Sequence, residues 1–108
     1  MGLTKTEDFT KAQNDLALLS KALGHPARIA ILQFLIKTQS CICGDIVDEL
    51  PLSQSTVSQH LSELKKAGLI KGNIDGPSVC YCIDEKAWSK ASKEIGNLFE
   101  SYKGADCC

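Results

Sequence analysis

Two amphipathic segments separated by a three-residue turn constrain the fold of this chain more than any other feature. The first runs from about Gly44 to Leu50 and must end there, because proline at position 51 disfavours helix in the residue before it. Ser53 is a good N-cap for the second, in which Val57, Leu61 and Leu64 follow at helical spacing until Gly68. The pattern predicts a helix-turn-helix unit.

A hairpin and three further helices complete the predicted domain. Residues 69–74 and 78–83 read as two strands around Asp75-Gly76-Pro77, in which Tyr81 alternates with Cys80 and Cys82. Apolar stripes predict three more helices: one that ends near Gly24, one that starts at Pro26 and one that follows Asp84. The predicted buried faces are Phe9, Ala12, Leu16, Leu19 and Leu23 in the first helix, Ile29, Leu32, Leu35 and Ile36 in the second, and Ala87 or Trp88, Ala91, Ile95, Leu98 and Tyr102 in the last. The expected fold is mainly α with a small β wing, a winged helix-turn-helix of order α-α-α-α-β-β-α. We expect one domain over residues 1–104, with a recognition helix at 54–67, a wing at 69–83, a C-terminal dimerisation helix at 85–103, and a cysteine-containing tail at 105–108.

Charge and composition limit the possible partners. Twelve Lys and Arg stand against thirteen Asp and Glu, so a net charge of -1 gives no global attraction to phosphate, and any DNA affinity must come from local placement of charge. No stretch approaches the roughly 20 apolar residues of a membrane span, and the start of the chain has no apolar run typical of a signal peptide. We therefore expect a cytoplasmic protein with reduced thiols.

Hydrogen-bonding side chains crowd the N-terminal part of the second helix of the helix-turn-helix unit. Glutamine can pair bidentately with adenine, and Ser and Thr can bond bases or phosphates. Lysines follow where contacts to the DNA backbone are expected. The predicted DNA-binding residues are Ser53, Gln54, Ser55, Thr56, Ser58, Gln59, His60, Lys65 and Lys66, with Lys71 as a further backbone contact.

Residues 16–103 resemble the ArsR/SmtB family of metal- and metalloid-responsive repressors. The resemblance rests on Ala22–Arg28 (ALGHPAR), on Ser53–Leu64 (SQSTVSQHLSEL) with Ala67–Ile70 after it, and on Val79–Ile83. It implies a homodimer paired through its first and last helices, bound to a palindromic operator and released by an inducer. Family wings usually carry Arg or Lys near the tip, whereas this one has Asn73, Asp75 and Gly76, so no strong minor-groove contact is expected from it.

The cysteines indicate what the inducer is. The only histidines are His25 and His60, neither in the last helix, which sets aside a His-rich site for zinc, nickel or cobalt. Six thiols suit trivalent arsenic or antimony, our best prediction, or a soft divalent ion such as Cd(II) or Pb(II). Cys41-Ile42-Cys43 resembles the family's Cys-x-Cys stretch at the start of the third helix, one position earlier than in the arsenic-sensing pattern.

Alternation places these thiols together. Cysteines two apart lie on one side of an extended segment, and a short strand at residues 40–43 that pairs with the wing would gather four of them in one patch. The predicted metal ligands are Cys41, Cys43, Cys80 and Cys82, with Cys107 and Cys108 in the tail as rival ligands. Ligation would alter the spacing of the recognition helices and lower operator affinity.

Other functions remain open at this level. A redox- or sulfide-responsive repressor could use a cysteine pair as a disulfide or polysulfide bridge. A winged helix that binds proteins and has no DNA role is the alternative of another class. An enzyme is not expected, because no histidine stands near any cysteine in the sequence.

Overall fold

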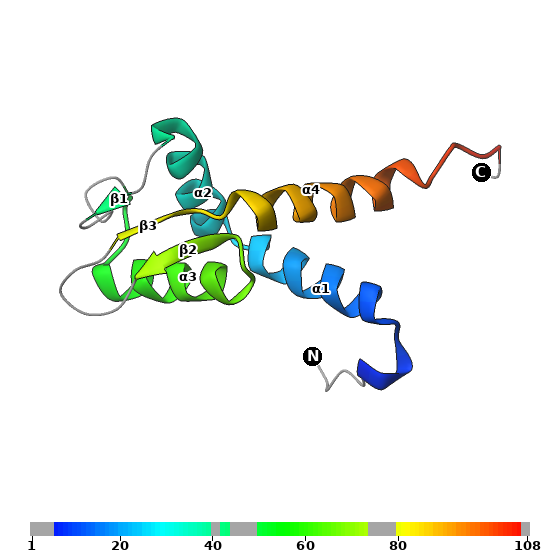
Figure 1. The fold of residues 1–108 in the computed structure, drawn as a ribbon, viewed down its shortest axis with the longest axis horizontal. Coiled ribbons are helices and arrows are strands. Elements are labelled where there is room, and N and C mark those ends of the chain that lie inside the picture. Colours follow the sequence, from blue (N-terminus) through cyan, green and yellow to red (C-terminus); the bar gives the residue numbers. More distant parts are fainter. Residues whose placement is uncertain (1–5, 40–41, 44–49, 74–79, 107–108) are drawn as a thin grey trace.

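The computed structural model describes residues 6–39, 42–43, 50–73 and 80–106. The molecule is elongated, 53 × 31 × 26 Å, with a small sheet and two of the helices at one end, from which the first and last helices extend towards the other end (Figure 1). A 3₁₀ turn (Thr6–Asp8) precedes α1 (Lys11–Leu23) and α2 (Pro26–Thr38). After them come β1 (Ile42–Cys43), the recognition helix α3 (Gln54–Lys66), β2 (Ile70–Asn73), β3 (Cys80–Ile83) and α4 (Glu85–Glu100). No helix within this part of the chain is long and apolar enough to cross a membrane.

Local capping explains where the helices begin. The Ser53 hydroxyl accepts a hydrogen bond from the Thr56 backbone N–H at the start of α3, and the Asp84 carboxylate accepts one from Ala87 at the start of α4. Each cap satisfies a backbone donor that has no partner inside its helix. Both caps are those expected from the sequence.

The sheet has the order β1-β3-β2, with antiparallel pairing throughout. Ile42 lies opposite Tyr81 and Cys43 opposite Cys80, which confirms the short strand expected before the helix-turn-helix unit. On the other side of β3, β2 follows directly from the recognition helix. The sheet therefore links β1, the strand before the helix-turn-helix unit, through β3 to β2, the strand after the recognition helix.

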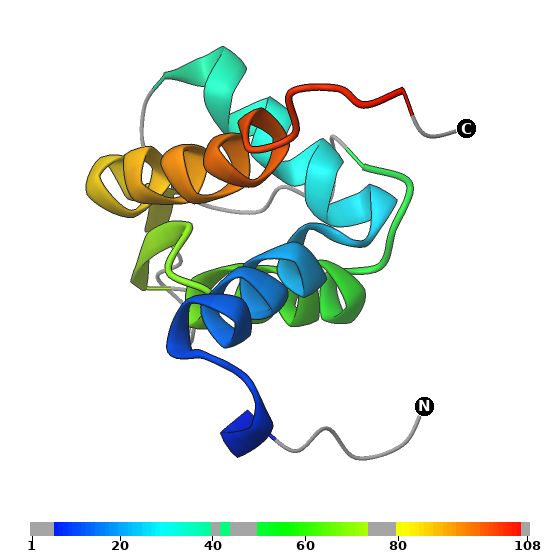
Figure 2. The same ribbon diagram turned by 90° about the vertical axis from the view of Figure 1, so that its right-hand side faces the viewer.

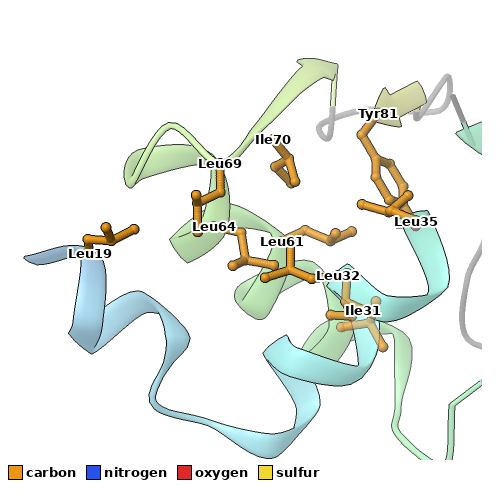
Figure 3. Packing of buried hydrophobic residues seen from close by; sticks show 10 residues of the cluster. Leu19, Ile31, Leu32, Leu35, Leu61, Leu64, Leu69, Ile70 and Tyr81 are labelled. Carbon is orange, nitrogen blue, oxygen red and sulfur yellow. The ribbon is translucent and has the colours of Figure 1, made fainter. Parts of the chain in front are cut away.

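The core lies where α2, α3 and the sheet meet (Figure 3). Ile31 and Leu64 are completely buried, and the Tyr81 ring closes the sheet side of the cluster at 1% exposure. The buried cluster consists of Leu19, Ile31, Leu32, Leu35, Val57, Leu61, Leu64, Leu69, Ile70 and Tyr81.

All three of the predicted helical core faces are partly wrong. On α2, Ile29 and Ile36 are exposed and Ile31 takes the buried position. The helix is apolar on nearly all sides, so periodicity alone cannot select the face that packs. Phe9 lies before α1 and is exposed.

On α4, the apolar stripe serves two environments. Trp88, Ala91 and Ile95 pack against the core, whereas Leu98 is exposed. The helix ends at Glu100 and not at residue 103 as predicted, so Tyr102, also exposed, follows it. The C-terminal part of α4 extends beyond the body of the molecule (Figure 1). The expected helix at residues 44–49, the wing tip at 74–79 and the last two cysteines lie outside the described residues.

Candidate nucleic-acid interface and cysteine site

The recognition helix α3 turns one side to the core and its polar residues outward. Val57, Leu61 and Leu64 are buried, while the side chains predicted to read DNA at Gln54, Ser55, Ser58 and Gln59 are exposed. Thr56 is half-buried, with its hydroxyl 2.9 Å from that of Ser53. The helix thus presents hydrogen-bonding side chains beside its own N-terminus, which favours phosphate oxygens.

Positive charge follows at the other end of the helix. Lys65 and Lys66 are exposed in its last turn, and Lys66 lies 3.7 Å from the Glu63 carboxylate across the helix surface. Lys71 is exposed on β2. An exposed ion pair of this kind is weak, so Lys66 can turn to phosphate at little cost.

His60 occupies a different setting from the other predicted DNA-contacting residues. It is half-buried, and its ring lies 4.3 Å, centroid to centroid, from that of His25, with the two planes tilted by 46°. His25 is the N-cap of α2, and its Nδ1 accepts a hydrogen bond from the Ala27 N–H at 3.0 Å. Burial, reinforced by the charges of His25 and Arg28, lowers the pKa of His60. No sequence pattern indicates this contact, because the two histidines are far apart along the chain.

The cysteines of β3 lie at the base of the wing. Tyr81 points into the core, so Cys80 and Cys82 share the opposite face of the sheet, and both are half-buried. Cys80 is disulfide-bonded, and Cys43 lies directly opposite it in register. Cys82 is a thiol opposite Lys71, and it lines a surface cavity of about 560 Å³ with Ile36, Glu85 and Trp88 among its neighbours.

The four-thiol patch is thus only partly visible. Within residues 6–39, 42–43, 50–73 and 80–106, no group of three or more metal-ligating side chains lies close enough to hold an ion. Cys41, Cys107 and Cys108 fall outside these ranges. The pairing of β1 with β3, which the patch requires, is present.

Known proteins place this architecture in a family. Residues 25–71 match the family model described as bacterial regulatory protein, arsR family. An HTH-type transcriptional regulator of Methanocaldococcus jannaschii is 42% identical over 96 residues, which are 87% of this chain and 97% of the relative. The chain belongs to the ArsR family.

Two further likenesses agree with this assignment. The transcriptional repressor SmtB of Mycobacterium tuberculosis (strain H37Rv) is 44% identical over 63 residues, covering 58% of this chain and 46% of that protein. The crystal structure of NolR from Sinorhizobium fredii matches with a TM-score of 0.60 and 27% identity, over 97% of this chain and 99% of NolR. These relatives confirm the winged helix-turn-helix fold and a DNA-binding transcriptional regulator that is not an enzyme.

In this ArsR-family regulator, α1 contacts both the recognition helix and α4 (Figure 2). Large apolar side chains remain exposed on α1 and on α4. Leu18 of α1 is 66% exposed, and Leu98 and Phe99 of α4 are 54% and 73% exposed.

Proposed function

We propose that this protein is a homodimeric, cytoplasmic repressor that leaves a palindromic operator when a thiophilic species reacts with cysteines at the base of its wing. The observation that carries the proposal is the register that sets Cys43 opposite Cys80, in a sheet whose outer strand follows directly from the recognition helix. Arsenite or antimonite is the proposed inducer, with Cd(II) or Pb(II) as the soft divalent alternative.

The DNA-reading surface is the exposed polar face of α3. Gln54 and Gln59 carry amides that can pair with adenine edges, and the hydroxyls of Ser55 and Ser58 can reach bases or phosphates. Ser53 and Thr56 hold the helix N-terminus, and Lys65, Lys66 and Lys71 supply phosphate contacts. His60 is left out of this set because its ring packs against His25.

The exposed apolar faces of α1 and α4 support the homodimer. Leu18, Leu98, Phe99 and Tyr102 are all more than half exposed, and a second copy pairing through the same two helices would bury them. This arrangement gives two recognition helices related by a two-fold axis. A two-fold protein requires a palindromic operator.

The inducer site would use thiolates on both strands of the β1–β3 pair. Residues directly opposite in an antiparallel pair share one face, so Cys43 and Cys80 fit a common ligand, and Cys82 is two positions along on that face. Cys41 completes the proposed set of four. Arsenous acid would take three of these thiols, exchanging its three hydroxyls for three sulfurs, and the thiol protons leave with the hydroxyls as three waters. Ligation would draw β1 and β3 together and shift β2 and the α3 that precedes it.

Fluorescence anisotropy of reduced protein on the DNA upstream of its own gene tests this site. We expect arsenite to release the wild-type protein, and Cys41→Ser, Cys43→Ser, Cys80→Ser and Cys82→Ser to weaken that release. The matched control, Cys107→Ser/Cys108→Ser, should respond like wild type; loss of response there would move the site to the tail. Unchanged induction in all four wing-base variants would contradict the proposed ligands.

A second candidate, a redox switch, is favoured by the disulfide at Cys80. We propose Cys43 as its partner, because the two residues are opposite one another in register. Hydrogen peroxide would take the two thiol hydrogens, leaving one disulfide and two waters. Peroxide treatment should then lower DNA affinity, dithiothreitol should restore it, and Cys82→Ser should leave both effects intact, whereas arsenite release requires Cys82. A response that survives Cys80→Ser would exclude this pair.

A further inference from the structure

The contact between His25 and His60 joins the recognition helix to the start of α2. Two imidazole rings whose centroids are 4.3 Å apart are in van der Waals contact. His60 lies beside the buried Leu61, on the flank of α3 that turns towards α2, whereas Ser58 and Gln59 are exposed. The ring of His60 is therefore packed against His25 and only half exposed to solvent.

His25 is held in place from its other side. Its Nδ1 accepts the Ala27 N–H at 3.0 Å, so this nitrogen carries no proton while the cap is intact. The same residue thus starts α2 and provides the surface against which His60 rests. A change in its charge would affect both contacts.

We propose that His25 and His60 are positioning residues that fix the recognition helix against α2, and that DNA binding requires the His60 ring to be uncharged. This inference uses the DNA-binding activity of the family but is independent of the thiol chemistry. It assigns His60 a role different from contact with a base or a phosphate.

The charged groups around the pair support this assignment. Arg28 of α2 adds a positive charge near His60, and its Nε is buried without a hydrogen-bond partner among the residues that the structure describes. Glu63 of α3 acts in the opposite sense but does not outweigh burial and the effects of His25 and Arg28, so the pKa of His60 lies below its ordinary value of 6.5. A proton added to the His60 ring is disfavoured by the guanidinium of Arg28 and by the neighbouring imidazole.

The sign of the pH dependence follows. Because the pKa of His60 is lowered in the packed state, the stabilising contact is complete above about pH 6.5 and is lost as the pH falls through the lowered pKa. A histidine that contacted phosphate directly would do the opposite, since its protonation would strengthen binding to DNA. Acid therefore distinguishes a positioning residue from a DNA contact.

The variants separate ring packing from charge. His60→Phe keeps a ring that cannot titrate, and His60→Asn removes the ring. His25→Asn keeps a good N-cap side chain but removes the ring, so α2 still starts correctly. The probe is a fluorescein-labelled duplex selected with the wild-type protein from a random-sequence library, and anisotropy gives Kd between pH 5.5 and 8.0, with circular dichroism confirming that each variant is folded.

At pH 8.0, we expect His60→Asn and His25→Asn each to weaken binding about two- to tenfold, as for the loss of an aromatic pair, and the double variant to be no weaker than the worse single one. His60→Phe should bind like wild type at pH 8.0 and keep its affinity at pH 5.5, where wild type loses affinity relative to it.

Two results would overturn the proposal: wild-type affinity that rises relative to His60→Phe as the pH falls, or single-variant effects that add in full. A library that yields no bound duplex would instead refute DNA binding itself. Urea unfolding at pH 8.0 of wild type, His60→Asn, His25→Asn and the double variant detects the coupling between His25 and His60 without DNA. A coupling energy of zero would also contradict the contact.

Discussion

Replacing Gly72 with alanine tests how closely β2 and β3 approach. Gly72 has a φ of +121°, a conformation that side chains rarely adopt, and it lies opposite Tyr81 in the sheet. A Cβ added there would lie 2.2 Å from the Cys80 carbonyl oxygen and 2.9 Å from the Tyr81 Cα. Both atoms belong to the backbone of β3, so no side-chain rotation relieves the contact.

The cost has two parts. An unfavourable backbone conformation costs about 1–3 kcal/mol. Moving β2 away from β3 weakens at least one ladder hydrogen bond, at about 0.5–1.5 kcal/mol. We expect Gly72→Ala to lower the free energy of unfolding by about 1.5–4.5 kcal/mol in total, a large share of the stability of a small domain.

Two other glycines provide matched controls. Gly104 also has a positive φ, +92°, but its added Cβ meets nothing within 4 Å, so Gly104→Ala should cost less than Gly72→Ala. Gly96 lies inside α4 with the same open surroundings, and Gly96→Ala should stabilise the protein by about 0.5–1 kcal/mol because alanine favours helix.

The free energies of unfolding of all three variants are measured by urea unfolding followed by circular dichroism. Reducing conditions ensure that no disulfide contributes. The expected order of stability is Gly96→Ala, wild type, Gly104→Ala and Gly72→Ala, from highest to lowest. If Gly72→Ala lost no more than Gly104→Ala, the close approach of β2 to β3 would be refuted.

Three further predictions concern the core, the recognition helix and the DNA contacts. Leu64→Ala should lower the free energy of unfolding, measured in urea, by about 2–5 kcal/mol because the Leu64 side chain is completely buried. Leu18 is exposed, so Leu18→Ala should change the stability of the monomer by no more than about 0.5 kcal/mol. It should raise the dissociation constant of the dimer, measured by sedimentation. Ser53→Ala should cost about 1 kcal/mol of stability and Ser53→Asn much less, since asparagine also caps; equal losses would contradict the cap. Gln59→Ala should weaken binding to the specific DNA sequence by about 1–3 kcal/mol. Lys65→Ala should weaken binding to all sequences and reduce the slope of log K against log salt by about 1 per site. An unchanged slope for Lys65→Ala would exclude a phosphate contact.

Local signals in the sequence predicted the helix starts well. Proline at position 26, the caps at Ser53 and Asp84, and the alternation around Tyr81 each depend on a few neighbouring residues, and the structure confirms them. The short strand that pairs with the wing was also predicted. These features are determined over distances of two to four residues, at which sequence patterns are informative.

Long-range contacts could not be predicted in the same way. The choice of Ile31 over Ile29 on α2 depends on which neighbours pack around an evenly apolar helix. The contact of His60 with His25 depends on how α2 and α3 meet. Polarity placed His60 in the predicted DNA-reading set and gave no indication of its contact with His25.

The recognition helix is held at two separate places, and this separation has a testable consequence. Its C-terminal end continues into β2 and the sheet that carries Cys80 and Cys82, whereas its flank rests on α2 through His60. The proposed thiol ligation would act on the first place, and the proposed effect of acid would act on the second. His60→Phe should therefore release DNA at the same arsenite concentration as wild type, and Cys80→Ser should keep the wild-type loss of affinity in acid. If His60→Phe also abolished arsenite release, the two restraints on α3 would have to be one coupled unit.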